Sequence, residues 1–239
     1  GKLALTLQFR DQTGGTVNFF ASPVTSSSFN LVAADDADST INEGAAGSAT
    51  LASSAGLTGV FNLTVADLGT SDAKATILTD ITYNITVSGG SDDALDFNWQ
   101  LFNGSTTFSP SATTATTVSF SSATLISVAN GGSGTLTLRA QVNAASATID
   151  NKTIGVNVTS TGITASASGT SLAASQSVTK AATTTVIVTA TQIQIVQQPG
   201  ASESVGVSFQ VTVQYADAQG NRDLNAVDTM SVDRNDAGL

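Results

Sequence analysis

Carboxylates are the side chains best suited to chemistry in this sequence, and they are densest just after residue 34. The group consists of Asp35, Asp36, Asp38 and Glu43, in a stretch otherwise rich in alanine and glycine. Carboxylate oxygens are hard ligands, and roughly six to eight oxygens surround a calcium ion in a protein. The pattern therefore predicts either a calcium site that stiffens a junction between domains or a solvated acidic linker.

A second acidic group occupies a predicted turn at residues 217–224. Its possible ligands are Asp217, Asn221 and Asp223. Aspartate, asparagine and glycine all suit a tight turn, because they cap it or tolerate its backbone angles. The closing glutamate of an EF-hand loop is missing. We therefore expect a plain turn here, with calcium binding as the alternative.

The residues that the chain lacks exclude several kinds of catalysis. It contains no cysteine and no histidine. Thiolate nucleophiles, histidine acid–base catalysis, disulfides and the usual zinc sites are thereby excluded. A glycosidase needs two carboxylates across a sugar cleft, but two tyrosines and one tryptophan offer few platforms for a sugar ring. We predict that the chain is not an enzyme.

The charge balance excludes several classes of partner. Eighteen acidic and eight basic residues give a net charge of -10. Nucleic acids and anionic membrane surfaces attract basic proteins, so neither is an expected partner. No apolar run approaches the roughly 20 residues of a membrane-spanning helix, and we expect no membrane insertion. The sequence also shows no targeting signal, as expected of a segment from inside a longer chain.

Composition and periodicity predict the elements that position these side chains. Hydrophobic residues make up 41% of the chain and charged residues 11%, with many threonines, valines, serines and glycines. Residues 205–215 alternate between apolar and polar, and this period of two indicates a sheet with one buried face. No helical stripe persists for three turns. The sequence therefore predicts an all-β fold.

The chain divides into three predicted parts. Residues 1–33 read as strands, because Leu3, Leu5, Leu7 and Phe9 alternate with polar residues. Residues 34–190 form a larger two-sheet sandwich with Greek-key connections, which begins with an acidic linker or long loop at 34–47 and holds Trp99 in or beside its core. Residues 160–172 are polar enough to be a loop. Its strands are expected at 48–52, 57–65, 75–87, 94–102, 116–120, 135–142, 153–159 and 176–190.

The terminal parts are predicted to be halves of one domain type. Residues 191–239 contain strands and a turn, but too few strands to bury their own apolar face. Together with residues 1–33 they have the length of a small immunoglobulin-like sandwich of roughly 100 residues or fewer. We therefore expect tandem immunoglobulin-like β-sandwich modules in an elongated array. In that array 1–33 is the C-terminal part of one repeat and 191–239 the N-terminal part of the next.

Two motifs resemble a known family. Gln198-Pro199 followed by the Asp-Ala-x-Gly-Asn-x-Asp-Leu turn at 217–224 resembles repeats of giant surface proteins of Bacteroidota. Residues 67–81 resemble the companion repeat that alternates with them in SprB-like gliding adhesins. The resemblance implies a repeat segment of a long extracellular filament on the cell surface, which serves attachment and, in gliding species, motility. Its implied partners are neighbouring repeats and the type IX secretion and gliding machinery.

The same resemblance implies two sites of O-glycosylation. In that phylum the modification follows Asp-Ser or Asp-Thr before a small residue, an aliphatic residue or threonine. Asp38-Ser39-Thr40 and Asp228-Thr229-Met230 fit this pattern, with Ser39 and Thr229 as the acceptors. A glycan there would add bulk and protease resistance. The alternative is two ordinary exposed hydroxyl groups.

Two other functions fit the same composition. A module that binds surface polysaccharide would present an exposed aromatic cluster around Trp99, Phe102 and Phe108. A lattice-forming surface-layer protein would join similar acidic sandwiches side by side, with lateral contacts larger than the end-to-end ones. Burial of the three aromatic residues would argue against the first.

Overall fold

The computed structural model describes residues 38–69, 73–89, 91–143, 148–198, 200, 202, 208 and 210–229. All of them belong to the second of two units into which the chain divides, Gly1–Val32 and Ala33–Leu239. The predictions for residues 1–33, for Asp35 and Asp36, and for residues 230–239 therefore lie outside the described residues.

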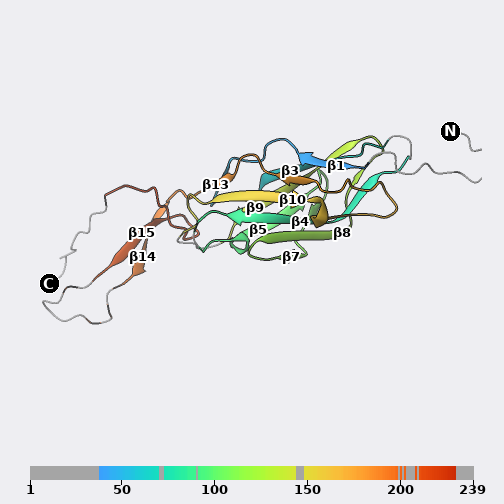
Figure 1. The fold of residues 1–239 in the computed structure, drawn as a ribbon. Coiled ribbons are helices and arrows are strands. Elements are labelled where there is room, and N and C mark those ends of the chain that lie inside the picture. The colour runs from blue at the N-terminus through green and yellow to red at the C-terminus, as the bar shows by residue number, and fades with distance from the viewer. Residues whose placement is uncertain are drawn as a thin grey trace, which may run out of the picture. The chain divides into compact units, whose positions relative to one another are not determined.

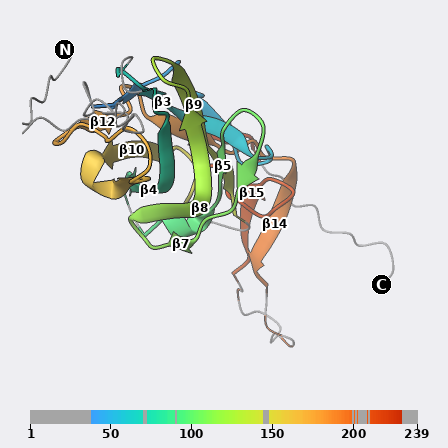
Figure 2. The same ribbon diagram turned by 90° about the vertical axis from the view of Figure 1, so that its right-hand side faces the viewer.

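The first sheet contains five strands among the described residues, in the order β1-β3-β9-β5-β6. Strands β3, β9 and β5 of this sheet are labelled in Figures 1 and 2. All neighbouring strands in it are antiparallel. Strand β9 lies at its centre and pairs with β3 on one side and β5 on the other. The bounds are β1 (Thr40–Glu43), β3 (Thr58–Ala66), β5 (Phe97–Phe102), β6 (Thr107–Phe108) and β9 (Ser133–Val142).

The second sheet has the order β2-β13-β10-β4-β8-β7 in the described part of the chain, with β11 paired to β4 and β12 to β10. The pair of β2 with β13 is parallel. Two single 3₁₀ turns, η1 (Ala94–Asp96) and η2 (Ser160–Gly162), are the helical elements of this part, and no helix within it is long and apolar enough to cross a membrane. The bounds are β2 (Thr50–Ala52), β4 (Thr76–Val87), β7 (Ala112–Thr113), β8 (Thr117–Val128), β10 (Thr153–Thr159), β11 (Ile163–Ala165), β12 (Ser177–Thr179) and β13 (Thr184–Ile187).

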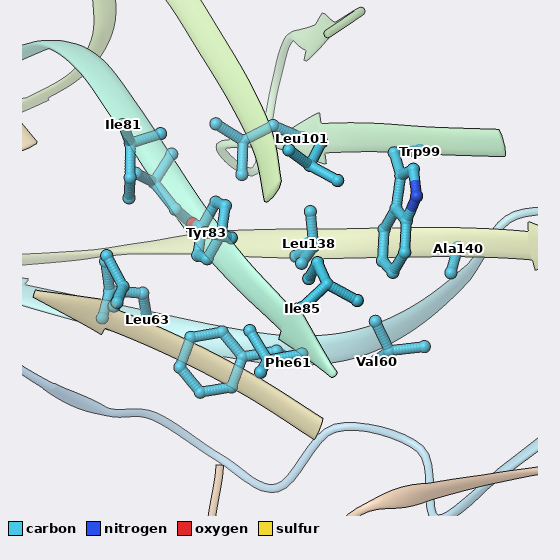
Figure 3. Packing of buried hydrophobic residues seen from close by; sticks show 14 of the residues in the cluster. Val60, Phe61, Leu63, Ile81, Tyr83, Ile85, Trp99, Leu101, Leu138 and Ala140 are labelled. Carbon is cyan, nitrogen blue, oxygen red and sulfur yellow. The ribbon is translucent and has the colours of Figure 1, made fainter. Parts of the chain in front are cut away.

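The two sheets share one hydrophobic core, as in a β-sandwich (Figure 3). Phe61 of the first sheet meets Tyr83 of the second edge to face, with ring centroids 6.0 Å apart. Trp99 is 6% exposed, and its indole Nε1 donates a hydrogen bond to the carbonyl of Ala94. The all-β prediction and the core position of Trp99 are confirmed, because alternation along each strand turns every second residue inward.

Some predicted loops contain short strands. The prediction of a linker or loop at 34–47 is wrong for Thr40–Glu43, which pairs with β3 and buries Ile41 to 3% exposure. Residues 160–172, also predicted as a loop, contain β11 with Ile163 buried. One apolar residue per strand is too few for a period of two to show in the sequence.

Strand β8 is longer than predicted. It continues from the expected end at residue 120 to Val128, and its register with β4 shifts between Leu78 and Asp80. The extra residues of a bulge oppose no partner and interrupt the alternation of side chains. The pattern in the sequence therefore ends before the strand does.

The third sheet is a pair of strands, β14 (Gln192–Gln197) and β15 (Thr212–Ala216), in the described part of residues 191–239. Its antiparallel register pairs Ile193 with Tyr215 and Ile195 with Val213, so these four residues share one face. The opposite face carries Gln194, whose amide oxygen accepts a hydrogen bond from Gln214 at 2.9 Å. Ile193 and Ile195 are 56% and 54% exposed. The hairpin is thus amphipathic, and its apolar face is open.

Candidate functional site

The acidic turn after β15 packs against the end of the sandwich. Asp217 is 1% exposed, and Asn221 is fully buried. The Oδ2 atom of Asp217 accepts a hydrogen bond from the hydroxyl of Ser53, 2.6 Å away and directly after β2. The first carboxylate of the turn therefore attaches the hairpin to the sandwich.

The same carboxylate also closes its own turn. Asp217 Oδ1 accepts hydrogen bonds from the backbone N–H groups of Gln219 and Asn221, each at 2.9 Å. Its Oδ2 atom accepts another from the Asn221 side-chain amide at 2.9 Å. Gly220 has φ +88°, a left-handed conformation that glycine adopts without strain. Burial opposes ionisation of Asp217, but the bonds from Ser53 and Asn221 outweigh it and hold the pKa of this carboxyl below its ordinary value.

Asp150 approaches the same junction from the sandwich. It lies in the turn before β10 and is 1% exposed. Its Oδ1 atom accepts the N–H of Val188, just after β13, and its Oδ2 atom accepts the N–H of Leu224, each at 2.9 Å. One carboxylate thus binds both the chain that leaves the sandwich and the turn that returns to it.

Asp223 makes the third connection. Its Oδ2 atom accepts the N–H of Ala190 at 3.0 Å, and its Oδ1 atom accepts the N–H of Asn225 at 2.8 Å. Beside it the side-chain amides of Asn151 and Asn225 bond each other at 3.2 and 3.1 Å. We refer to Asp150, Asp217 and Asp223 as the junction carboxylates. Asp217 and Asp223 are predicted turn residues, whereas Asp150 is not among the candidates that the sequence indicates, although the pair Asp150-Asn151 is typical of a turn.

The junction carboxylates accept hydrogen bonds from the protein's own backbone and side chains. Every bond described above comes from a neutral N–H or O–H donor of the protein. Among the described residues no group of three or more acidic, histidine or cysteine side chains is arranged to hold a metal ion. Calcium binding by Asp217, Asn221 and Asp223 stays a prediction, and an ion there would have to replace the donors that now occupy Asp217.

The other acidic candidates bind separate loops. Asp38 Oδ1 accepts a hydrogen bond from the Ser171 hydroxyl at 2.6 Å. Both carboxylate oxygens of Glu43 face the N–H of Ala181, at 3.1 and 3.0 Å. Because Asp35 and Asp36 lie outside the described residues, a calcium site formed by all four stays a prediction.

The two predicted glycosylation acceptors differ in their surroundings. Ser39 is fully buried, and its hydroxyl shares a hydrogen bond with that of Thr76. A sugar cannot be added to a hydroxyl that does not reach solvent. Modification of Ser39 therefore stays a prediction only if the sugar is added before this part of the chain folds. Thr229 is exposed. Its modification stays a prediction with an accessible acceptor.

The three aromatic candidates do not form one exposed cluster. Trp99 is buried, and Phe108 packs against the core. Phe102 points out of the first sheet and lies beneath the guanidinium of Arg139, whose Cζ atom is 3.9 Å from the ring centroid. Of the three rings, Phe102 alone therefore faces outward, and the three do not form the exposed aromatic cluster expected of a sugar-binding module.

Comparisons with known proteins identify no relative. No family model, no curated protein and no solved structure matches this chain.

Proposed function

We propose that this chain is a structural segment of a long extracellular filament on a cell surface. In this filament it keeps successive immunoglobulin-like sandwiches apart and bears tension between them. The observation that carries the proposal is the junction between the sandwich and the hairpin. A spacer needs stiff connections, and here the junction carboxylates bind the connecting backbone from both sides.

The connecting segment, residues 188–191, shows how this stiffness arises. The N–H groups of Val188 and Ala190 donate to Asp150 and Asp223, and the N–H of Thr191 donates to the carbonyl of Ala216 at 2.9 Å. Hydrogen bonds to a charged acceptor contribute about 1.5–3 kcal/mol each. A linker held in this way loses the freedom that its backbone would have in water.

The apolar face of the hairpin supports the tandem part of the proposal. A two-stranded sheet is marginal by itself in water, and Ile193 and Tyr215 also line an open cavity of about 560 Å³. We propose that strands equivalent to residues 1–33, supplied by the neighbouring repeat, cover this face. Leu3, Leu5, Leu7 and Phe9 in that segment alternate as a covering strand requires.

The biological setting of the proposal comes from the resemblance alone. The motifs at residues 67–81 and 217–224 support export by the type IX system and a role in attachment or gliding. Calcium at the acidic stretch around Asp38 and Glu43 would add stiffness. The surface-layer alternative stays a prediction.

The filament proposal is tested with chains of one, two and more linked copies. Small-angle scattering should show a maximum dimension that grows in proportion to the number of copies. The double variant Asp150→Ala/Asp223→Ala should shorten the longer chains, whereas Asp228→Ala, an exposed carboxylate in the same segment, should not. Growth with the square root of copy number in the unaltered chain would contradict a stiff spacer.

The covering of the hairpin is tested by hydrogen exchange on the two-copy chain. The amides of β14 and β15 should be protected in the first copy, where residues 1–33 of the second copy follow, and less protected in the last. Ile195→Gln should remove this difference between copies. Equal exchange in both copies would mean that the neighbouring repeat does not cover the apolar face.

A further inference from the structure

The outer face of the five-stranded sheet has a composition unlike the rest of this acidic chain. On β5 and β9 every second side chain points into the core, as Trp99 and Leu138 do. The side chains next to these along each strand point outward. The register places Asn98 opposite Gln141 and Gln100 opposite Arg139. The outward positions therefore form a surface of amides with one aromatic ring and one cation: Asn62, Asn98, Gln100, Phe102, Arg139 and Gln141.

Arg139 is held in place on this surface. Its guanidinium lies over the ring of Phe102, with Cζ 3.9 Å from the centroid, and its Nη1 atom donates to the Gln100 Oε1 atom at 3.4 Å. Gly59, opposite Arg139 on β3, adds no side chain to this part of the surface. Contact with an aromatic ring fixes a guanidinium without using up its N–H donors. Among the described residues Arg139 donates one hydrogen bond, to Gln100, so its other N–H donors are available to a ligand.

The charge of Arg139 is also left without a carboxylate. Among the described residues the ion pair found is that of Lys152 with Asp92, which lies elsewhere. The outward positions named above include no aspartate or glutamate, although the whole chain has a net charge of -10. A fixed cation beside uncharged amides favours a ligand that brings one carboxylate and many hydroxyl groups.

We propose that this face binds an acidic polysaccharide in which single uronate sugars are separated by neutral ones. Arg139 would pair with the uronate carboxylate, while Asn98, Gln100 and Gln141 would bond neighbouring sugar hydroxyls. A densely charged polyanion is disfavoured, because one cation cannot offset the repulsion from the net negative charge. The site goes beyond the proposed spacer role, since a filament can be stiff without binding anything along its side.

Weak sites of this kind gain strength by repetition. If each repeat presents the same face, one polysaccharide chain meets several copies, and the second contact becomes intramolecular. The whole chain should therefore bind weakly as a single copy and much more tightly as linked copies.

The experiment uses the intact chain, in one and two linked copies, with gellan as the probe, because gellan carries one glucuronate in each repeating unit. Gellan whose carboxyls have been reduced to alcohols is the matched ligand. Arg139→Gln should weaken binding about tenfold, the loss expected of one charge-assisted contact. Lys74→Gln, which makes the same change in net charge at a different place, should leave binding unchanged. Arg139→Lys should recover part of the affinity.

Each outcome decides for or against the site. Tighter binding of native than of reduced gellan, lost in Arg139→Gln, supports it. Equal binding of both gellans, no binding of either, or an unaffected Arg139→Gln variant overturns it. Stronger Arg139-dependent binding of single-stranded DNA or poly-glutamate than of gellan also overturns the polysaccharide assignment. If Arg139→Gln fails to fold, as judged by circular dichroism, the comparison of native with reduced gellan still decides.

Discussion

The sandwich and the hairpin of this chain are held together in different ways. In the sandwich, two sheets enclose a core in which Phe61, Leu63 and Leu138 are fully buried. In the hairpin, Ile193 and Ile195 stay more than half exposed, and order at its base comes from hydrogen bonds to carboxylates. The first is stabilised by the hydrophobic effect, which grows with buried area, and the second by a few directional contacts.

The two regions are therefore sensitive to different substitutions. The sandwich is destabilised when a buried side chain is replaced by a smaller one, but little by the removal of a surface charge. The junction is destabilised when a hydrogen-bond acceptor is removed, but little by apolar substitutions nearby. The following changes separate the two kinds of stabilisation.

The largest effect is expected for Leu138→Ala in the central strand β9. Leu138 is fully buried, so truncation leaves a cavity and should lower the free energy of unfolding of the sandwich by about 3 kcal/mol. Urea unfolding followed by Trp99 fluorescence measures the change. A loss below about 1 kcal/mol would mean that the site collapses freely and that the core is not closely packed.

The next largest effect is expected for Asp217→Ala. It leaves the donors from Ser53 and Asn221 without their acceptor and should cost about 2 kcal/mol of local stability at the junction. Hydrogen exchange should speed up at Val188, Ala190 and Thr191, with the core amides of β9 unchanged. Asp228→Ala is the control. Faster exchange throughout β9 would show that junction and sandwich unfold as one unit.

Low pH should also destabilise the junction before it destabilises the sandwich. The folded pKa of Asp217 lies below its ordinary value of 3.8. Its contribution to stability is therefore present above about pH 4 and is lost as the pH falls through the folded pKa. Protection of the junction amides, corrected for the intrinsic pH dependence of exchange, should fall below pH 4 before the sandwich unfolds, and Asp217→Asn should weaken this dependence. Simultaneous acid unfolding of both regions would contradict a separate junction.

A smaller effect of opposite sign is expected inside the core. The hydroxyl of Tyr83 is buried without a hydrogen-bond partner in the described part of the chain, and burial raises the pKa of this phenol. Tyr83→Phe removes an unsatisfied polar group and should stabilise the sandwich by about 1 kcal/mol in urea unfolding. Tyr215→Phe on the open hairpin is the matched change and should leave the midpoint unaltered. Destabilisation by Tyr83→Phe would reveal a partner for the hydroxyl.

The smallest effect in a single copy is expected for Ile195→Gln. The side chain is 54% exposed, so its replacement should change the free energy of unfolding by less than about 0.5 kcal/mol. In two linked copies, the proposed covering of this face predicts a larger cost in the first copy. An equally small effect in one copy and in two linked copies would mean that the neighbouring repeat does not cover the apolar face of the hairpin.

The sequence alone determined the strands whose alternation is long and regular. Strand β10 has the predicted bounds, and β3, β4 and β9 lie within one or two residues of theirs. The same alternation predicts that Trp99 lies in the core. A period of two is a local property, so it can be read from neighbouring residues without knowledge of the fold.

Which carboxylates act together depends on contacts between distant parts of the chain. Asp217 meets Ser53 across a sequence separation of 164 residues, and Asp150 meets Leu224 across 74. The tertiary structure also decided that Ser39 is buried and that Phe102 lies beneath Arg139. Such contacts depend on how sheets and turns are brought together over long distances. The sequence could therefore name aspartates as candidates, while folding determined which N–H and O–H groups they bind.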